Sequence, residues 1–494
     1  MSEKNILEEN IADSKITGST IAESTIKESD ITEESMTVEQ AVDYVYASYL
    51  KAEPYLDYAA PDCEKRNPGL SKAIIAKRAG IPTALVTGSK GKGSVAKMIA
   101  EIMGVHRKTG LMTSPHIVTF HERFQIQGEP VNDEALSLAV MRVKPEFDAV
   151  ERKLSCKEYI SPMGIQAAVA LELFRAADVE FQVLECGKGA AFDDVNNVPH
   201  KYAVINRIFL EHTRELGSTL SEIAENKAAI MTGQAVSGQA VMEQGRDSGA
   251  EEDKSAGQII FTAEQAPEVM AVLERHAREK GCELLRYGKD FWCENIVYTE
   301  QGMHFDVVTG RNRYEGIQIP LLGTYQAKNC ALALALCEEE LGSLQIEAVK
   351  AALKWLEWPG RLEILSSNPL VLLDACINRS SCENVLEALE QLKLEKINVI
   401  IGIPMDKDYL GVAQAMQSVA HRIILTKSSN PHYRFGQEQV QVLKTAGLEA
   451  DWAENIAEAL KRARFKQPDV PVCILGTTSL ISDVKKLAKT PVAL

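Results

Sequence analysis

A short apolar strand that runs directly into a glycine-rich loop is the feature that most constrains this chain. Residues 83–94 read TALVTGSKGKGS, two residues shorter than the usual Walker loop. Glycines let the backbone turn tightly and direct several N–H groups at one anion. Lys92 supplies a charge for the β- and γ-phosphates, and Ser94 opens a helix expected over residues 95–103, whose dipole favours the same anion. The expected nucleotide-binding residues are Gly88, Ser89, Lys90, Gly91, Lys92, Gly93 and Ser94.

Length and composition are those of a large enzyme. The 494 residues exceed what one hydrophobic core usually serves, so two or three domains are expected. The chain has no run of about 18 apolar residues, so no transmembrane helix is predicted. A formal charge of −15 argues against nucleic acid as a partner. Ten cysteines without a Cys-x-x-Cys pair, and an N-terminus without an apolar signal core, predict reduced thiols and a cytoplasmic location.

The first 36 residues form a separate pattern. An isoleucine or methionine recurs every five residues from Ile6 to Met36. This period resembles the pentapeptide repeat, a square β-helix in which one apolar residue per side points inward. The alternative is an acidic, disordered tail rich in Ser, Thr and Glu. We favour the short coil and expect no catalytic chemistry in it. The chain is expected to be a monomer, with residues 1–36 as the candidate site of any association.

From Val38 onward, helical and strand patterns alternate. Thr37, with Gln40 three residues later, predicts the N-terminus of a helix. Helices separate many of the expected apolar strands, which lie at 84–87, 181–185, 202–206, 371–374, 398–402, 421–425 and 471–475. This alternation predicts an α/β fold with parallel sheets covered on both faces, and it makes a chance glycine turn at 88–93 a poor alternative. A polar insertion is expected at 243–258.

Further segments, in matching order, resemble the Mur ligase superfamily and within it the folylpolyglutamate and dihydrofolate synthases. The shortened loop is shared with the superfamily, and residues 110–128 resemble the TSPH…ER…NG signature of these synthases. The other matching segments are VLECGKG at 183–189, EHTRELG at 211–217, ENKAAI at 225–230, LLGTYQAKNCALAL at 321–334, WPGRLE at 358–363, DACIN at 374–378 and MDKDY at 405–409. The resemblance extends from about residue 38 to the C-terminus.

The resemblance implies a P-loop-containing central domain over residues 37–357 and a smaller Rossmann-like ligase domain over residues 358–494. A hinge is expected at WLEWPGR, residues 355–361. The implied activity is that of an ATP-dependent carbon–nitrogen ligase, which converts a carboxylate into an acyl phosphate for attack by an amino acid amine. The partners would be a small-molecule carboxylate and an amino acid, with ATP and Mg²⁺ as cofactors.

Metal and carbamate roles follow from the same resemblance. Glu185 ends a buried strand, where open α/β sheets bind ligands. The implied Mg²⁺ ligands are Ser94, Ser114, Glu185 and His212. Lys227 occupies the position of the family lysine that CO₂ carbamylates. Taken singly, Glu185 could be a surface carboxylate, His212 a capping or core histidine, and Lys227 an exposed helical lysine.

Three residues are implied to hold the rest of the nucleotide. Asn329 matches the asparagine that reads the adenine edge, and Asp374 matches the carboxylate that accepts from ribose hydroxyls. Arg361 matches the hinge arginine that clamps phosphate when the domains close, a task that suits its planar fork. The alternative for Arg361 is a hinge salt bridge. The residues implied to carry catalysis are Lys92, Lys227, His212 and Arg361.

Several motifs on the substrate side are altered. Ile377 stands where the family's DGAHNP has a histidine associated with the incoming glutamate, and Thr477 stands where GSLYL has a serine. Met163-Gly164 replaces a Phe-Glu pair, and the arginine of GGRLD is missing from residues 189–193. Isoleucine cannot hydrogen-bond a carboxylate or ammonium group. We therefore expect weak glutamylation of folates.

Three interpretations stay open. The chain is a folylpolyglutamate synthase with tolerated drift, an amide ligase for another carboxylate or amine, or a nucleotide-binding protein that has lost ligation. The retained phosphate and metal residues disfavour the third.

Overall fold

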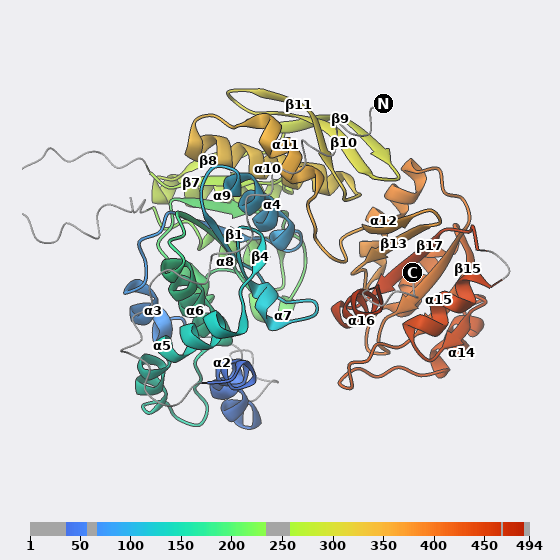
Figure 1. The fold of residues 1–494 in the computed structure, drawn as a ribbon, viewed down its shortest axis with the longest axis horizontal. Coiled ribbons are helices and arrows are strands. Elements are labelled where there is room, and N and C mark those ends of the chain that lie inside the picture. The colour runs from blue at the N-terminus through green and yellow to red at the C-terminus, as the bar shows by residue number, and fades with distance from the viewer. Residues whose placement is uncertain (1–35, 57–66, 234–256, 466–467, 489–494) are drawn as a thin grey trace, which may run out of the picture.

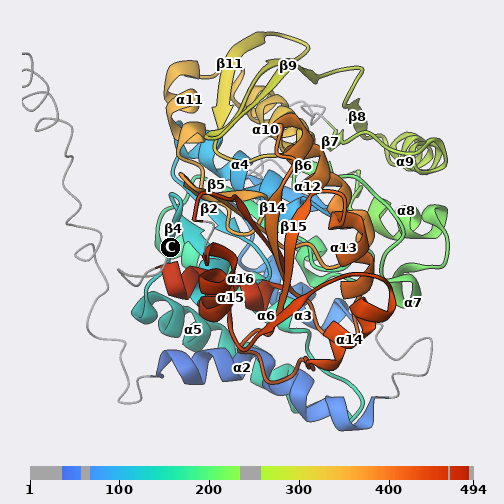
Figure 2. The same cartoon turned by 90° about the vertical axis from the view of Figure 1, so that its right-hand side faces the viewer.

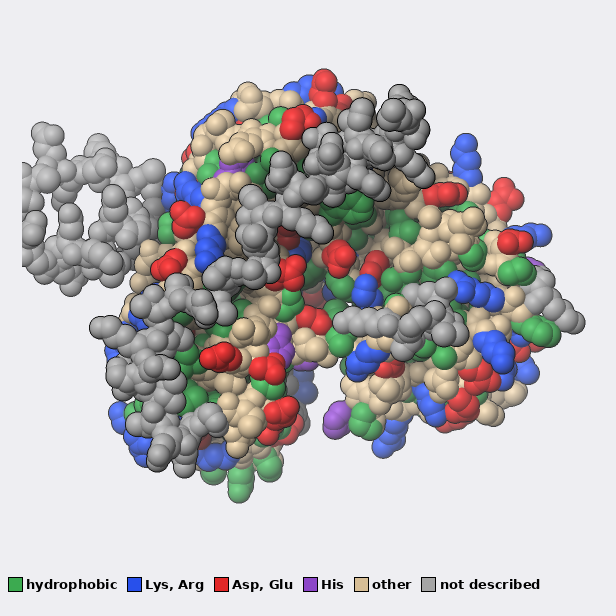
Figure 3. All heavy atoms as spheres, viewed as in Figure 1, with side chains coloured by type: hydrophobic (Ala, Val, Ile, Leu, Met, Phe, Trp, Pro, Cys, Tyr) green, Lys and Arg blue, Asp and Glu red, His purple; other side chains and the backbone are tan. Residues whose placement is uncertain are grey.

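The computed structural model describes residues 36–56, 67–233, 257–465 and 468–488 (Figure 1). A larger lobe precedes the connection at 355–362, and a smaller lobe follows it. The space-filling view shows a hollow between the lobes with acidic and basic side chains along it (Figure 3). The expected repeat at 1–36 lies outside the described residues, apart from Met36, which packs against the larger lobe.

An eight-stranded sheet forms the centre of the larger lobe. Its spatial order is β4 (Glu129–Pro130), β3 (Phe124–Ile126), β2 (Thr109–Met112), β5 (Phe181–Glu185), β1 (Thr83–Thr87), β6 (Tyr202–Ile205), β7 (Ile259–Thr262) and β8 (Glu283–Arg286). The strands from β2 to β8 in this order run parallel, and β3 and β4 continue the sheet antiparallel. Ala84 and Val86 of β1 face one core and Leu85 faces the other, so both faces of the sheet are buried.

Helices cover both faces of this sheet (Figures 1 and 2). One face packs against α4 (Lys92–Gly104), α10 (Thr324–Leu341) and α11 (Ile346–Lys354). The other packs against α2 (Val38–Ala52), α3 (Gly69–Ala76), α5 (Asp133–Glu151), α6 (Pro162–Ala176), α8 (Leu220–Ala228) and α9 (Pro267–Lys280). The short elements are η2 (Glu53–Tyr55), η3 (Phe120–Arg123), η4 (Asp194–Asn197) and α7 (Thr213–Leu216). Among the described residues, no helix is long and apolar enough to span a bilayer.

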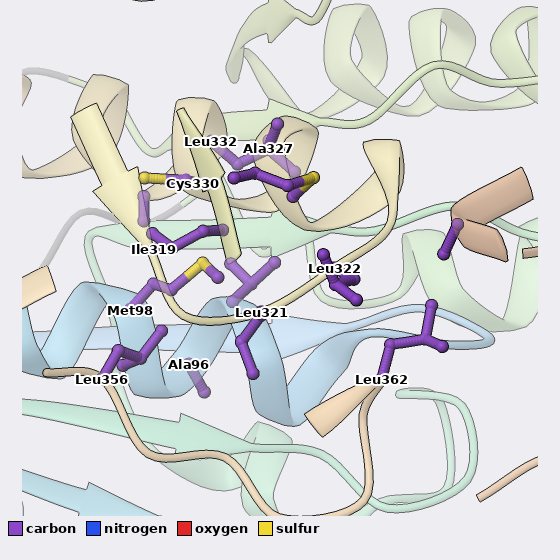
Figure 4. Close-up of a cluster of buried hydrophobic side chains, with 14 of the residues drawn as sticks. Ala96, Met98, Ile319, Leu321, Leu322, Ala327, Cys330, Leu332, Leu356 and Leu362 are labelled. Carbon is purple, nitrogen blue, oxygen red and sulfur yellow. The ribbon is translucent and has the colours of Figure 1, made fainter. Parts of the chain in front are cut away.

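A three-stranded antiparallel sheet packs against α10 and α11. Its strands are β9 (Trp292–Thr299), β10 (Gly302–Val308) and β11 (Arg313–Ile319). Side chains from α4, from the end of β11 and from α10 meet in one apolar cluster that includes Met98, Ile319 and Cys330 (Figure 4). This packing fixes the start of α10 beside the start of α4, where the phosphate loop ends.

The smaller lobe is a second three-layer unit. Its sheet has the order β12 (Glu363–Ser367), β13 (Leu370–Asp374), β17 (Val472–Gly476), β14 (Ile397–Gly402), β15 (Ala420–Thr426) and β16 (Asp451–Ala453). Only β12 is antiparallel to its neighbour among these described strands. The helices are α12 (Arg379–Gln391), α13 (Tyr409–Met416), α14 (Glu438–Thr445), α15 (Ile456–Arg464) and α16 (Thr478–Ala488).

The structure confirms the expected strands and corrects two boundaries. All seven strands expected from apolar runs occur, and Thr37 and Gln40 form a capping box at the start of α2. The helix after the phosphate loop begins at Lys92 rather than Val95, because Gly91 adopts a left-handed φ of 76° that starts the helix at once. Ser94 therefore lies inside the first turn. The insertion expected to end at Gln258 ends earlier, since Gln258 is buried and donates to the Ile230 carbonyl.

Candidate active site

The phosphate loop joins β1 to α4 and lies against the end of β6. Gly88 has a φ of 142°, and a Cβ at this position would lie 2.8 Å from Cβ of Asn206. At Gly91 a Cβ would lie 2.6 Å from Nδ2 of Asn206. Gly88 is required because the Asn206 backbone lies against it, and Gly91 is favoured because its left-handed φ of 76° is strained for other residues. The loop is thus held by Asn206, a residue that the sequence analysis did not select.

Two lysines converge on one carbonyl of this loop. Lys92 Nζ donates to Gly88 O at 3.2 Å, and Lys227 Nζ donates to the same oxygen at 2.9 Å. Lys227 is fully buried and forms an ion pair with Glu211 at 3.1 Å. Burial, followed by the charge of Lys92, lowers the pKa of Lys227 to about 8. Lys227 is therefore not the exposed helical lysine of the alternative interpretation.

Glu185 lies against the same loop from the end of β5. Its Oε2 accepts from Ser114 N at 3.0 Å and lies 3.3 Å from where a Cβ of Gly93 would be. Burial raises the pKa of Glu185, whereas Lys92, Arg361 and the Ser114 N–H oppose the rise. Glu185 is thus a buried carboxylate surrounded by cations, not a surface carboxylate.

The donor set around Glu185 fits a hard cation in part. Ser94 Oγ is buried and has no hydrogen-bond partner among the described residues, so it is available as a ligand. A carboxylate and a hydroxyl are the oxygen ligands that Mg²⁺ prefers. The described residues contain no group of three or more His, Cys, Asp or Glu side chains arranged to hold a metal ion. Any Mg²⁺ here would therefore depend on serine, water and phosphate oxygens as well.

His212 lies at the edge of this group. It precedes α7 in a left-handed conformation with a φ of 45°, and its side chain is exposed. Although the residue is exposed overall, desolvation of its ring by neighbouring groups lowers its pKa; Glu211 opposes this shift and Lys188 assists it. The imidazole is therefore neutral near pH 7 and able to act as a ligand. Its assignment to the metal stays a prediction.

The smaller lobe contributes a carboxylate and the hinge contributes an arginine. Asp374 ends β13, and its Oδ2 accepts from Leu362 N at 2.8 Å. Burial raises the pKa of Asp374 to about 6, against the charges of Arg361 and Lys90. Arg361 Nη1 donates to Gly360 O at 3.2 Å, and Arg361 acts electrostatically on both Glu185 and Asp374. Arg361 is therefore near enough to lower the pKa of both carboxylates, and it forms no ion pair with either among the described contacts.

Asn329 lies on the far side of the phosphate loop. Its Oδ1 accepts from Asn206 Nδ2 at 3.0 Å, and its Nδ2 donates to Gln326 Oε1 at 3.1 Å. Asn206 in turn accepts from Gln265 through its backbone carbonyl. A cavity of about 600 Å³ adjoins this chain of amides and is lined by Glu264, Gln265, Met270, Arg286, Tyr287, Gly288, Lys289 and Lys328.

Ser89 and Lys90 complete the loop. Ser89 N donates to Arg207 O at 3.0 Å, and Ser89 Oγ bonds with the Phe209 backbone. Lys90 reaches the smaller lobe, where its Nζ donates to Ser381 Oγ at 2.8 Å. The predicted loop residues therefore lie together from the end of β1 to the first turn of α4. The Lys90 side chain, however, bonds to Ser381, whereas Lys92 and Lys227 both donate to the Gly88 carbonyl.

The altered substrate-side positions differ in their surroundings. Thr477 follows β17, next to the strand that ends in Asp374, and its buried hydroxyl has no hydrogen-bond partner among the described residues. Ile377 is half-buried in the loop between β13 and α12. Gly164 lies under the carboxylate of Asp194, where a Cβ would be 2.6 Å from Oδ1. The positions are therefore not clustered in one place.

Residues that the sequence analysis missed include Asn206, Glu211 and Gln265. Asn206 follows β6, at the same sheet edge as the phosphate loop and Glu185. Its position after a buried strand was the available signal. Glu211 and Gln265 lie in loops, and only tertiary contacts reveal their roles.

Comparisons with known proteins identify the family of this chain. Residues 86–337 match the family described as Mur ligase middle domain, and residues 360–477 match Mur ligase, glutamate ligase domain. A folylpolyglutamate synthase of Lacticaseibacillus casei is 28% identical over 81% of this chain and 88% of its own length. A dihydrofolate synthase/folylpolyglutamate synthase of Bacillus subtilis is 28% identical over 82% of this chain and 90% of its own.

A solved structure of Mycobacterium tuberculosis folylpolyglutamate synthase, complexed with ADP and AMPPCP, has a TM-score of 0.75 at 25% identity. The alignment covers 90% of this chain and 99% of that one. The middle-domain match alone extends over more than half of the sequence and contains the phosphate loop, Glu185, Lys227 and Asn329. The chain belongs to the Mur ligase family.

Proposed function

We propose that this protein is an ATP-dependent amide ligase of the folylpolyglutamate synthase type. It activates a carboxylate as an acyl phosphate, which the amine of an amino acid then attacks. The observation that carries the proposal is the convergence of Lys92 and Lys227 on the Gly88 carbonyl, with buried Glu185 against Gly93 on the other side of the loop. A phosphoryl-transfer site needs positive charge and a metal-binding carboxylate at one place.

The chain's own groups divide the work of phosphoryl transfer. Lys92 leaves the Gly88 carbonyl and pairs with the transferring phosphoryl group. Arg361 supplies a second cation from the hinge, near Glu185 and Asp374. Glu185, Ser94, Ser114 and His212 would hold Mg²⁺, which neutralises phosphate charge when bound. Lys227, as a carbamate, would add an anion beside the cations of the loop.

We assign the other end of ATP to the cavity lined by Gln265, whose side chain donates to the Asn206 carbonyl next to Asn329. The cavity offers the Tyr287 ring as an apolar wall and the amide of Gln265 as a polar group. Asn329 is held by Asn206, which also packs against the loop glycines. The base and the phosphates would thus be placed by one connected set of amides. Asp374, in the smaller lobe, would accept hydrogen bonds from the ribose hydroxyls.

The amine substrate is expected at the sheet edge of the smaller lobe. Within the described part of the chain, the buried Thr477 hydroxyl has no hydrogen-bond partner, and an ammonium or carboxylate group would supply one. Ile377 offers only apolar contact at the neighbouring loop. This favours a second candidate, an amide ligase of the same mechanism with an amine other than glutamate or a carboxylate other than folate. One related solved structure is described as an FPGS-AMPPCP-folate complex, so folates belong among the carboxylates to be tested.

We further propose that residues 37–357 and 358–494 act as two domains, that the protein works as a monomer in the cytoplasm, and that residues 1–36 are its candidate site of association. All nine cysteines among the described residues are free, including Cys376 and Cys382, whose sulfur atoms lie 3.3 Å apart.

The test is ADP release by the purified full chain with a panel of carboxylates and amino acids. A ligase requires a carboxylate and an amine together for sustained ADP release, with one amide formed per ADP. ADP release that is independent of both substrates would contradict the proposal.

A further inference from the structure

The first turn of α12 is connected to the phosphate loop by one side chain. Lys90 Nζ donates to Ser381 Oγ at 2.8 Å and lies 5.3 Å from the centre of the Phe209 ring. Ser381 is buried, and its hydroxyl also donates to Asn378 Oδ1 at 2.7 Å. Since a serine hydroxyl has one proton, the lone pairs of Ser381 remain for Lys90. The bond therefore has a fixed direction, from the loop to the helix.

A second connection holds the same helix farther along. Glu387 Oε1 accepts from Tyr298 OH of β9 at 2.9 Å, and it also accepts from the Thr324 hydroxyl at the start of α10. Thr324 opens the helix that carries Asn329. Both ends of the nucleotide site, the phosphate loop and the start of α10, therefore contact α12.

Helix α12 leads directly to the catalytic face of the smaller lobe. Asn378 caps it, with Oδ1 accepting from Ser381 N at 2.9 Å, and only residues 375–377 separate this cap from Asp374. Any shift of the first turn would therefore move the loop that follows β13. Lys90 also acts electrostatically on Asp374 across the same gap.

We propose that Lys90 is a positioning residue: its hydrogen bond to Ser381 sets the place of α12, and so of the loop at 375–378, against the phosphate loop. This inference rests on the ligase function proposed above and assigns to Lys90 a task distinct from phosphate binding. The backbone of Lys90 stays in the loop, while its ammonium group serves the contact between the lobes. Lys90 then controls how the amine meets the acyl phosphate rather than how the acyl phosphate forms.

Two readouts separate these steps. Hydroxylamine, a small nucleophile, traps an acyl phosphate as a hydroxamate without using the amine site, whereas amide formation needs the smaller lobe in place. We expect Lys90→Met to raise KM for the amine by about fivefold or more, a typical size for coupling between sites. KM for ATP and the rate of hydroxamate formation should stay within about twofold of wild type.

The controls use the same chemistry. Lys90→Arg keeps a donor for Ser381 and should restore KM for the amine to within about twofold. Ser381→Ala should raise KM for the amine, and the double variant should be no worse than Lys90→Met, because both remove the same bond. Lys427→Met removes an exposed lysine that lies in the smaller lobe and pairs with Glu454 at 2.8 Å, and it should change neither readout.

Two results would overturn the inference. Lys90→Met could raise KM for ATP and slow hydroxamate formation as much as amide formation, which would make Lys90 a phosphate ligand. It could also leave KM for the amine unchanged, which would make the bond to Ser381 incidental. If wild-type protein forms no hydroxamate with any carboxylate of the panel, the ligase function itself fails, and that result is separate from both.

Discussion

Lys227 should exist partly as a neutral amine near pH 7, and we predict that it reacts with CO₂. Its side chain is fully buried, and its pKa is lowered to about 8. With that pKa, about one amine in ten is uncharged at pH 7 and about half at pH 8, against fewer than about one in a thousand for an ordinary lysine at pH 7. Only the neutral amine attacks CO₂, forming an N–C bond and releasing a proton.

The charge of Lys92 is the second cause of this low pKa, after burial. A neighbouring cation disfavours protonation of Lys227, so Lys92→Met should raise the pKa of Lys227. The pH at which carbamate forms should then move upward, on the order of one unit for each 1.4 kcal/mol of lost repulsion. Glu211 acts in the opposite sense, so Glu211→Gln should move the profile downward.

The assay is NMR of protein equilibrated with ¹³C-bicarbonate between pH 6.5 and 9, with Lys227→Met to identify the signal. We expect one buried carbamate signal that grows through about pH 8 and is absent from Lys227→Met. A wild-type protein without that signal at pH 8.5, or a Lys92→Met profile identical to wild type, would refute the reasoning.

Four further outcomes are expected. Glu185→Gln should sharply weaken turnover at limiting Mg²⁺, and full activity there would remove Glu185 from the metal site. Gly93→Ala should lower turnover because its Cβ would lie 2.6 Å from the Trp358 ring. An unchanged rate would mean that the Trp358 ring moves aside without affecting the site. Deleting residues 1–36 should leave kcat and KM nearly unchanged; loss of ATP turnover by the folded protein would place this segment at the active site. Glutamylation of tetrahydrofolate should be weak, and rates on the order of 10 s⁻¹ would restore an ordinary folylpolyglutamate synthase.

Seven strands were predictable from apolar runs, whereas β2 and β7, which are also buried throughout, were not predicted. Residues 471–475 are apolar throughout, as expected for a strand with helices on both sides, and residues 472–475 lie in the buried strand β17. The antiparallel strands β9 to β11 were not predicted, since they are partly exposed and mix charged residues such as Glu294 and Arg313 with apolar ones. Their place is set by packing on α10 and α11, which local sequence does not contain.

The candidate site, like the fold, was predictable from the sequence only in part. The phosphate loop was predictable because its glycines and Lys92 lie close together in the sequence. In the structure, Glu185 and Lys227 both lie against this loop. Asn206 was missed because its task, filling the space that Gly88 and Gly91 leave, depends on a neighbouring strand. The contact of Lys90 with the smaller lobe likewise joins residues that are 291 positions apart.

The central claim is that the phosphate loop drives ligation, and Lys92→Ala tests it most directly. ADP and amide should be measured together for wild type and variant, with binding of ATP followed separately. The account predicts coupled ADP and amide formation in the wild type and loss of both in Lys92→Ala, because the transferring phosphoryl group loses its fixed cation. Near wild-type turnover by a correctly folded Lys92→Ala would show that the loop is structural and would contradict the account.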